Sequence, residues 1–386
     1  PRGGRRMRLT LAISSLAAGG AEHVLSALAS HWAEHEWPVT FVTLDSTSTD
    51  FYKLHPSVDR IALNASRDSQ TLLQAVSSNV DRVQRLRTVI RDSQPDVVIS
   101  FMTSTNVLAL IAARKERVPV VVSERADPRY YPIQSAWAGL RRLTYPWASA
   151  IVVQTPEVGQ WAKGFVRPEA VKVIPNFVVA PADGFRRYGE PIAIDAANAR
   201  PAVRQVMGMG RLDDQKGFDL LIRAFAMCRK GRPGWQLTIL GEGVRRAEFE
   251  ALARKLDVAS HVRFLGRVED PTRYLREADL FVLSSRYEGF PNALLEAMAL
   301  GLPVIATDCP SGPAHIVRHS VDGLLVPNQD VGALASSMAA LMDDESGRMA
   351  LGAEAISVTE RFNVDRIITT WETLLTDVAT RSRVHA

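Results

Sequence analysis

The sequence contains only two cysteines in 386 residues, Cys228 and Cys309. They lie far apart and form no C-x-x-C pair, so the spacing of neither a zinc site nor a redox motif is present. Two such cysteines provide no disulfide framework, and a reducing compartment fits the chain better than a secreted one. We therefore expect a cytoplasmic protein.

Long apolar runs are also missing. No stretch reaches about 18 apolar residues, so we expect no segment that spans a membrane. The run Leu9–Leu16 is short and contains Thr10, Ser14 and Ser15, which does not match a signal peptide. The remaining composition, 46% hydrophobic and 23% charged residues, is typical of a globular protein.

The net charge is small, +4, but it is unevenly distributed. Lys and Arg exceed Asp and Glu by 6 in residues 1–176, whereas acidic residues are in excess by 2 in the rest of the chain. A basic half is suited to an anionic surface. A solvated face with a chance excess of Lys and Arg explains the count equally well.

Strand-length apolar runs alternate with helical patterns in both halves of the chain. Continuous apolar strands with helical crossovers predict parallel sheets that helices cover on both faces. We expect two Rossmann-like, doubly wound α/β domains that face a central cleft, with ligands at the carboxyl ends of the strands. Segment Asp45–Arg67 is rich in Ser, Thr and Asp, and we interpret it as a loop. The expected strands are Arg8–Ser14, Val39–Leu44, Asp96–Phe101, Val118–Val122, Ala150–Val153, Val171–Ile174, Val203–Met209, Trp235–Leu240, Val262–Leu265, Leu280–Ser284, Val304–Thr307 and Gly323–Val326.

The domain boundaries follow from the place where this alternation stops. Residues 177–202 are rich in Pro and Gly with little periodicity, and they predict an interdomain linker. The N-terminal domain then spans residues 7–176, and the C-terminal domain spans residues 203–362. A helical pattern in residues 363–386 predicts a last helix that packs back toward the N-terminal domain.

A first glycine motif, Gly19-Gly20-Ala21-Glu22, follows the first expected strand and opens the first helix. Two glycines let the backbone approach a ligand closely, and the amino end of a helix favours an anion. The motif is not the G-x-G-x-x-G dinucleotide fingerprint. A tight turn between strand and helix explains it as well.

A second motif, GMGRLDDQKG over residues Gly208–Gly217, again lies between a strand and a helix. Its glycines permit a close turn, and Arg211 and Lys216 place two cations at the end of the strand, as a diphosphate requires. A polar turn with two solvated cations is the alternative.

A third motif, EGFPNALLE over residues Glu288–Glu296, holds two carboxylates that lie about 80° apart in helical phase at roughly 100° per residue. Pro291 suits the first turn of a helix. Both carboxylates then reach one side, where they can bind vicinal hydroxyls while the amides of Gly289 and Phe290 hold a phosphate. An amphipathic helix with surface glutamates is the alternative.

These motifs together resemble the retaining glycosyltransferases of family 4, which have the two-domain glycosyltransferase-B (GT-B) fold. The resemblance covers nearly the whole chain and is strongest in Val203–Pro327. Gly19–Glu22 and Ser123-Glu124-Arg125 resemble the branch that builds lipid-linked or cell-surface oligosaccharides, including N-acetylgalactosaminyltransferases that extend undecaprenyl-diphosphate-linked glycans. The matching motifs are Gly210-Arg211-Leu212, Lys216-Gly217, Gly241-Glu242-Gly243 and Glu288-x7-Glu296.

The resemblance implies a role for each matching position. Arg211 and Lys216 would neutralise the diphosphate of a UDP-sugar donor. Glu288 would hold hydroxyls of the donor sugar, and Glu296 would hold the ribose. The other implied donor-binding residues are Gly19, Gly20, Gly210, Arg267, Val268, Gly289, Phe290, Pro291 and Asn292.

Arg125 departs from the family, because many relatives carry a histidine at this position. Histidine there would bond a hydroxyl of the donor sugar, whereas arginine stays cationic and suits the departing phosphate or an anionic acceptor. We expect Arg125 to be catalytic, and a surface ion pair with Glu124 or Asp127 is the alternative. His315 stands where a glutamate is commoner, and we assign it no role.

The implied reaction is the transfer of a hexose or N-acetylhexosamine with retention, which forms an α-glycosidic bond. The cations stabilise the leaving diphosphate, and one of its oxygens takes the proton of the acceptor hydroxyl. No D-x-D pair stands at the end of a strand in the expected cleft, so we expect neither a metal nor a cofactor besides the UDP-sugar substrate.

The acceptor, an oligosaccharide or a polyprenyl-diphosphate-linked glycan, is expected at the N-terminal domain. Residues 114–147 interleave seven Lys and Arg with five Tyr and Trp. This mixture suits an anionic membrane surface, and it predicts a peripheral location on the inner face of the cytoplasmic membrane. A core helix with inward-facing aromatic residues is the alternative.

Other functions on the same fold stay open at this point. A nucleotide-sugar epimerase or a nucleotide-sugar-binding protein would use a similar donor site without glycosyl transfer. The missing dinucleotide fingerprint disfavours a dehydrogenase, and the small basic excess disfavours a nucleic-acid binder.

Overall fold

The computed structural model describes residues 6–65, 71–180 and 203–384. The chain divides into unit 1, residues 1–176 with 365–386, and unit 2, residues 177–364. Most of the predicted linker 177–202 lies outside the described residues.

Unit 1 is built on a parallel sheet of seven strands in the order β3-β2-β1-β4-β5-β6-β7. Strands β1, β2, β4, β5 and β6 are buried along their whole length, because helices cover both faces of a parallel sheet. The strands are β1 (Leu9–Ile13), β2 (Val39–Thr43), β3 (Asp59–Ala62), β4 (Val97–Phe101), β5 (Val120–Ser123), β6 (Ala150–Val153) and β7 (Val171–Val173).

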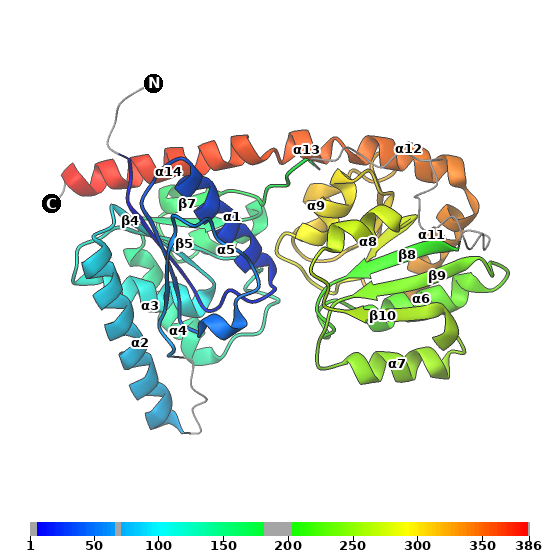
Figure 1. The fold of residues 1–386 in the computed structure, drawn as a ribbon, viewed down its shortest axis with the longest axis horizontal. Helices are drawn as coiled ribbons and strands as arrows, with labels where there is room; N and C mark the ends of the chain where they lie inside the picture. Colours follow the sequence, from blue (N-terminus) through cyan, green and yellow to red (C-terminus); the bar gives the residue numbers. More distant parts are fainter. Residues whose placement is uncertain (1–5, 66–70, 181–202, 385–386) are drawn as a thin grey trace. The chain divides into compact units, whose positions relative to one another are not determined.

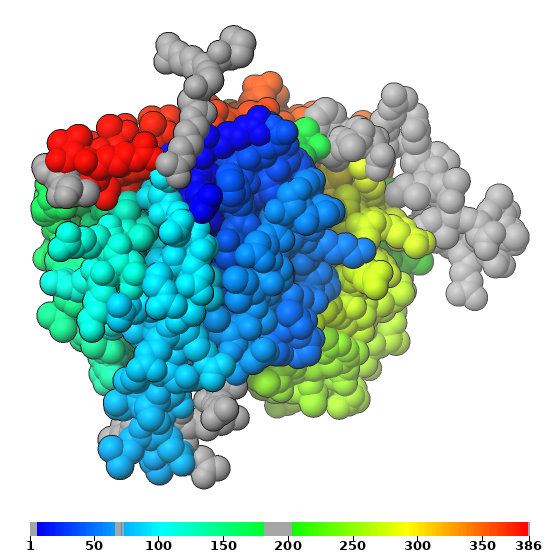
Figure 2. All heavy atoms as spheres, turned by 60° about the vertical axis from the view of Figure 1, so that its left-hand side comes forward, coloured from blue at the N-terminus to red at the C-terminus, as the bar shows by residue number. Residues whose placement is uncertain are grey.

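The helices of unit 1 include the last helix of the chain. In α14, Trp371 is fully buried and its ring lies 6.1 Å from that of Phe101, while Arg383 pairs with Asp96 at 2.7 Å. Figure 2 shows α14 (red) along one side of unit 1, and the amino-terminal turns of α2 project from the body of the unit in both views. The helices are α1 (Gly20–Glu34), α2 (Leu72–Ser93), α3 (Thr103–Arg114), α4 (Ser135–Thr144), α5 (Pro156–Lys163) and α14 (Val364–Val384).

Unit 2 repeats the architecture with six parallel strands in the order β10-β9-β8-β11-β12-β13 (Figure 1). Its strands are β8 (Arg204–Met209), β9 (Trp235–Leu240), β10 (Val262–Gly266), β11 (Leu280–Leu283), β12 (Val304–Asp308) and β13 (Leu324–Pro327). Its helices are α6 (Phe218–Arg229), α7 (Arg246–Lys255), α8 (Pro271–Glu277), α9 (Asn292–Ala299), α10 (Pro313–Ile316), α11 (Val331–Asp343), α12 (Glu345–Ala355) and α13 (Val358–Arg361).

The predicted fold class, two doubly wound parallel α/β domains, is confirmed. The prediction of a loop over Asp45–Arg67 is wrong for Asp59–Ala62, which forms strand β3 and pairs with β2. β3 lies at the edge of the sheet and is partly exposed. An edge strand tolerates charged residues such as Asp59 and Arg60, so it lacks the apolar run by which a central strand is identified.

Local sequence signals explain where several helices begin. The side chain of Thr71 accepts a hydrogen bond from the amide of Gln74, and the Asp330 side chain accepts one from Ala333. Such side chains satisfy amides that have no partner within the helix.

Among the described helices, none combines the length and the apolar character that a membrane crossing requires.

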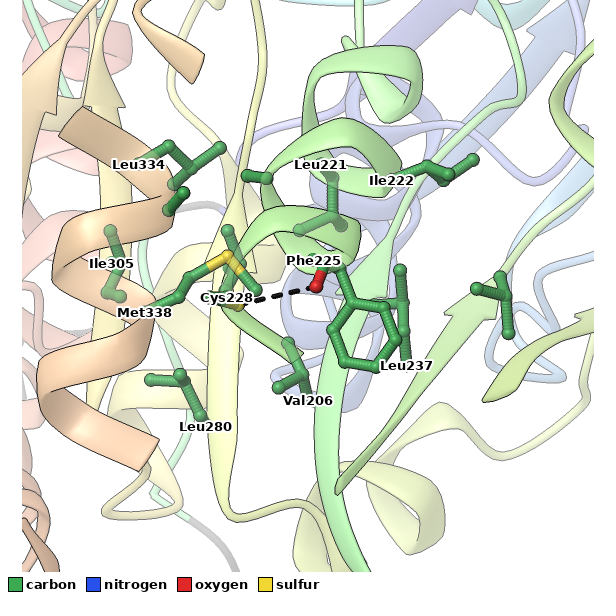
Figure 3. Close-up of a cluster of buried hydrophobic side chains, with 14 of the residues drawn as sticks. Val206, Leu221, Ile222, Phe225, Cys228, Leu237, Leu280, Ile305, Leu334 and Met338 are labelled. Atoms are coloured by element: carbon green, nitrogen blue, oxygen red, sulfur yellow. Dashed lines mark hydrogen bonds between the residues drawn. The ribbon is translucent and has the colours of Figure 1, made fainter. Parts of the chain in front are cut away.

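One hydrophobic cluster of unit 2 lies between its sheet and helices α6, α7 and α11. Figure 3 shows Phe225 of α6 pointing toward Val206 and Leu237 of the sheet, with Met338 of α11 nearby. Cys228 belongs to this cluster, and its burial raises the pKa of the thiol to about 11. This cysteine is therefore a packing residue with little thiolate character.

Truncation of this core should destabilise unit 2. We expect Phe225→Ala to lower the free energy of unfolding by about 3–5 kcal/mol, because it removes a buried ring and leaves a cavity. Hydrogen exchange of the β8 and β9 amides would report the change for unit 2 alone. Met227→Ala on the same helix, where the side chain is 59% exposed, should leave the exchange nearly unchanged. Equal exchange in the two variants would contradict the assignment of Phe225 to the core.

Candidate functional site

The strand order of each sheet reverses at one point. In unit 1 the reversal lies between β1 and β4, and in unit 2 it lies between β8 and β11. At such a switch point the loops leave a crevice at the carboxyl ends of the strands, where ligands bind in open α/β sheets. The switch point of unit 2 brings together the second and third motifs, which follow β8 and β11.

At the centre of the switch point of unit 2 lies an ion pair between Lys216 and Glu288. Their Nζ and Oε1 atoms are 2.6 Å apart, although the residues are 72 positions apart in the chain. The Glu288 side chain is 5% exposed and the Lys216 side chain 19%. The two predicted catalytic residues therefore neutralise each other at the switch point.

Two residues that the sequence analysis missed orient Glu288. Buried Ser285 donates its hydroxyl to Oε1 of Glu288 at 2.6 Å, and Thr307 donates to the carbonyl of Ser285 at 2.6 Å. Serine or threonine at the end of a strand is only weak sequence evidence for a functional role, because both residues are common in loops. Only the fold shows that Ser285 meets Glu288 and that Thr307 holds the backbone of Ser285.

Glycines allow the loops at the switch point to pack backbone against backbone. Gly217 has a φ of +61°, and a Cβ atom there would lie 2.2 Å from the carbonyl oxygen of Ser284. A Cβ atom on Gly241, whose φ is +132°, would lie 1.9 Å from the carbonyl oxygen of Gly210. Gly210 in turn leaves room for the stem of Lys216, which a Cβ atom would meet at 3.1 Å. These glycines are required by packing before any ligand is considered.

Arg211 is placed differently from Lys216. Its side chain is 61% exposed, and its Nε lies 3.7 Å from the Asp213 carboxylate. Asp213 also accepts the backbone amide of Lys216 at 3.2 Å. The structure thus brings Lys216 and Glu288 together but leaves Arg211 at the solvent-exposed rim of the loop.

A second group of contacts that the sequence did not predict joins the loop of Lys216 to the loop of Glu288. Arg286 donates two hydrogen bonds to Asp219, at 2.9 and 2.8 Å, and one to the carbonyl of Asp214 at 2.8 Å. Its own amide donates to the carbonyl of Gln215 at 2.8 Å. A bidentate arginine holds a fixed geometry, so Arg286 sets the distance between the loop of Lys216 and the loop of Glu288.

The third motif continues into helix α9. Pro291 occupies its N-cap position, and its side chain makes no cap hydrogen bond. Buried Phe290 packs edge-on against Phe362 at 5.2 Å, and Ser311 donates to the carbonyl of Gly289 at 3.4 Å. These contacts fix the turn that precedes Asn292, the first residue of the helix.

Glu296 lies in the second turn of α9 and is partly buried. Burial raises the pKa of its carboxyl to about 7. A carboxyl with such a pKa changes its charge near neutral pH.

Arg267 and Val268, two further predicted donor-binding residues, follow β10 at the edge of the same sheet. Arg267 is exposed and Val268 is partly buried.

In unit 1 the first glycine motif begins helix α1, with Gly19 as its N-cap residue and Gly20 as its first residue. Tyr52 donates its hydroxyl to the carbonyl of Gly19 at 3.2 Å and stacks on His23 at 5.3 Å. A Cβ atom on Gly19 would lie 2.2 Å from the carboxylate of Glu22. The carboxylate therefore folds back over the turn.

Arg125 is buried, and the alternative of a surface ion pair is wrong. Its guanidinium donates to the side-chain oxygen of Asn176 and, at 3.4 Å, to Ser123, and it lies 4.5 Å from the ring centre of Phe101. Asp127 pairs with Arg129 instead. Burial lowers the pKa of Arg125 to about 9, because few charged or polar partners compensate the loss of water.

No group of three or more His, Cys, Asp or Glu residues within the described ranges is arranged to hold a metal ion. In the second motif Asp214 pairs with Arg245 at 2.6 Å. The acidic pair Asp213-Asp214 is thus engaged within the protein.

Two family models match the chain. Residues 19–176 match the glycosyl transferase 4-like domain, and residues 194–358 match the glycosyl transferases group 1. A Campylobacter jejuni protein, GalNAc-α-(1→4)-GalNAc-α-(1→3)-diNAcBac-PP-undecaprenol α-1,4-N-acetyl-D-galactosaminyltransferase, is 29% identical over 96% of this chain and 99% of its own. The amylovoran biosynthesis glycosyltransferase AmsD of Erwinia amylovora is 26% identical over 92% of this chain and 96% of its own.

Solved structures share the fold at low sequence identity. HepE of Anabaena, in complex with UDP and glucose, has a TM-score of 0.77 at 20% identity and covers 96% of this chain and 100% of its own. Sucrose-phosphate synthase of Thermosynechococcus elongatus has a TM-score of 0.80 at 20% identity, with 97% and 100% covered. These likenesses confirm the two-domain architecture.

The titration of Glu296 should appear in the pH dependence of stability. The folded carboxyl has a pKa of about 7 against an ordinary value of 4.5, so between these pH values the folded protein binds more protons than the unfolded chain. Stability therefore falls as the pH rises through this window. We expect the melting temperature of Glu296→Gln, relative to that of the original protein, to rise between pH 5 and pH 8. Exposed Glu269→Gln is the control, and a pH-independent difference for Glu296→Gln would contradict the shift.

Proposed function

Because the chain belongs to glycosyltransferase family 4, we propose that it transfers a hexose or an N-acetylhexosamine from a UDP-sugar to a lipid-linked or cell-surface oligosaccharide. The observation that carries the proposal is the Lys216–Glu288 pair, 2.6 Å apart at the switch point of unit 2. It supports the proposal because a cation, and a carboxylate that can accept hydrogen bonds from hydroxyls, lie close to the start of α9. The name of the Campylobacter relative supports a polyprenyl-diphosphate-linked acceptor, and the UDP complex of the Anabaena structure supports a uridine donor.

The donor diphosphate would take the place of Glu288 as the partner of Lys216. The lysine Nζ then neutralises phosphate oxygens, with Arg211 reaching in from the rim, and Glu288 accepts hydrogen bonds from hydroxyls of the donor sugar. The turn of Gly289, Phe290, Pro291 and Asn292 directs the positive end of α9 at the phosphates. Glu296 accepts the ribose hydroxyls, Gly210 permits close approach, and Arg267 and Val268 border the base.

The proposed chemistry retains the anomeric configuration and forms an α-glycosidic bond. The bond from the anomeric carbon to the diphosphate oxygen breaks, and its electron pair leaves with UDP. The acceptor oxygen forms the new bond on the same face of the sugar, and its proton passes to an oxygen of the leaving diphosphate. Lys216, Arg211 and the amino end of α9 stabilise the developing charge, so the proposal requires no metal and no cofactor.

Thermal unfolding against free nucleotides and nucleotide sugars, in excess chelator, tests the donor site. We expect UDP and one UDP-sugar to stabilise the protein by roughly 2.7 kcal/mol at about 100 times the dissociation constant. Lys216→Ala should lose most of this shift and about 10²–10³ in turnover. Lys230→Ala, which removes an exposed lysine of the same unit, should keep both.

A shift with another nucleotide would contradict the uridine donor and leave the phosphate site intact. No shift with any nucleotide, or normal turnover in Lys216→Ala, would contradict the donor site itself. Activity that chelator abolishes and magnesium restores would contradict metal independence.

We also propose that unit 1 meets an anionic membrane surface, where a lipid-linked acceptor is presented. The predicted basic and aromatic segment 114–147 exposes Leu143 (63%) and Trp147 (39%), and the Arg114 guanidinium lies 4.1 Å from the ring centre of Trp147. The prediction is wrong for Arg141 and Tyr145, which are buried. The remaining exposed side chains still combine cations with apolar groups, as an interfacial surface does.

Flotation with liposomes that contain anionic lipid tests this surface. We expect the protein to float with the vesicles and the variant Leu143→Ser to float markedly less, because Leu143 would insert below the headgroups. Met349→Ser, which changes a 43% exposed apolar residue of unit 2, is the control. Equal flotation of the two variants, or no flotation of the original protein, would contradict the membrane contact.

A further inference from the structure

Arg125 follows strand β5 but does not line the cavity at the end of that strand. Unit 1 contains a cavity of about 300 Å³ at the carboxyl ends of β1, β4 and β5, where the strand order reverses. Of the described residues, Glu124 and Ala126 line this cavity, whereas Arg125 between them does not. The contacts of Arg125 therefore lie elsewhere in unit 1.

One of these contacts is with the segment that leaves unit 1. The Arg125 guanidinium donates to the side-chain oxygen of Asn176, and Gln154 donates to the same oxygen at 2.7 Å. All three residues are buried. Asn176 is the last residue of unit 1 before the chain enters unit 2. Two buried donors thus fix this side chain at the point where the chain departs.

The next fixed point of the chain belongs to unit 2. Val178 is buried, and its amide donates to the carbonyl of Phe362 at 3.0 Å. Only Phe177 lies between the side chain that Arg125 holds and this backbone hydrogen bond. One residue has only two soft backbone dihedrals. The first connection between the units therefore has little freedom as long as both fixed points hold.

The second connection between the units is the start of helix α14, which crosses the boundary at residues 364 and 365. Trp371 of this helix is 1% exposed, and its ring lies 6.1 Å from that of Phe101. The Arg125 guanidinium lies 4.5 Å from the centre of the same Phe101 ring. One buried arginine therefore contacts the residue that ends the first connection and the ring on which the second connection packs.

The burial of Arg125 is not compensated by an acidic neighbour in the sequence. The carboxylates of Glu124 and Asp127 pair with other arginines of unit 1. Burial lowers the pKa of Arg125 to about 9, and its Nε has no hydrogen-bond partner among the described residues. A desolvated cation with neutral partners lowers stability. An apolar side chain would fill the same space without this cost, so packing alone does not explain an arginine here.

We propose that Arg125 is a positioning residue that holds both connections in unit 1, rather than a group that touches the donor or the acceptor. In the proposed function unit 2 binds the donor and unit 1 meets the acceptor, so turnover requires both units, whereas nucleotide binding requires unit 2 alone. The link to turnover rests on the proposed glycosyltransferase function. The anchoring of the two connections rests on the contacts of Arg125 alone.

Hydrogen exchange and steady-state kinetics of Arg125→Met, Asn176→Ala and the double variant, each in the complete protein, test this assignment. We expect faster exchange of the amides at 176–178 in all three, because the first connection loses its anchor. Turnover should fall about ten- to hundredfold, since a small misplacement of reacting groups suffices, while UDP still stabilises the variants. The double variant should lose no more than Arg125→Met, because both changes break the same contact.

Two controls accompany these variants. Arg91→Met, which removes a 60% exposed arginine of α2, should change neither the exchange nor the turnover. The amide of Ile174, which donates to the carbonyl of Val153 at 2.8 Å, should stay protected and so report that unit 1 is folded. If Arg125→Met does not fold, the comparison of Asn176→Ala with Arg91→Met still decides.

Normal turnover in Asn176→Ala would overturn the proposal, and a loss confined to Arg125→Met would show that this residue acts on a substrate directly. Additive losses in the double variant, unchanged exchange at 176–178, or loss of the UDP stabilisation would also overturn it. If no nucleotide stabilises the original protein, the proposed function fails. Faster exchange in Arg125→Met and Asn176→Ala would then still support the anchoring.

Discussion

Each sheet has one point where consecutive strands turn to the opposite side, and the sites of this protein depend on that reversal. All strands of a parallel sheet end at the same edge, so their loops gather there. In unit 2 the reversal between β8 and β11 puts Lys216 and Glu288 in contact, and in unit 1 the reversal between β1 and β4 opens the cavity beside Glu124. The same topological constraint thus produces a site in each unit.

The two sites differ in their electrostatics. In unit 2, Lys216 and Glu288 satisfy each other, and Arg286 braces the two loops through Asp219. The pair fixes the position of Lys216 at the switch point and compensates the buried charge of Glu288. In the proposed function a diphosphate would take over Lys216, and hydroxyl donors of the sugar would have to compensate the carboxylate of Glu288 instead.

In unit 1 the buried polar groups form hydrogen-bonded networks with few ion pairs. Glu124 is held by Thr103 and Tyr145, and Arg125 is held by Asn176, which Gln154 also contacts at 2.7 Å. Among the described residues, Nε of Arg125 and Oε1 of Gln154 have no hydrogen-bond partner, so the burial of this network keeps an energetic cost. The polar groups of unit 1 are thus linked mainly by hydrogen bonds, whereas Lys216 and Glu288 of unit 2 form an ion pair.

The sequence by itself determined the fold class, the alternation of strands and helices, and membership of a glycosyltransferase family. Those properties depend on local periodicity and on motifs whose residues lie close together in the chain. The Lys216-Gly217 and Glu288–Asn292 segments could be selected in this way, because glycines, cations and a proline at a helix start are visible locally. Strand β3 could not, since an edge strand lacks a long apolar run.

Only the tertiary structure decided which side chains meet. Lys216 reaches Glu288 across 72 positions and Arg125 reaches Asn176 across 51. Ser285 donates to the Glu288 carboxylate, and Thr307 donates to the backbone carbonyl of Ser285. Arg211 and Lys216 are similar cations in one motif, but the Arg211 side chain is 61% exposed, whereas Lys216 forms a largely buried pair with Glu288. The cavity of unit 1 could not be predicted, because its lining comes from loops after three strands that become neighbours only when the sheet forms. Contacts of this kind depend on strand order and packing, which local patterns of residues do not specify.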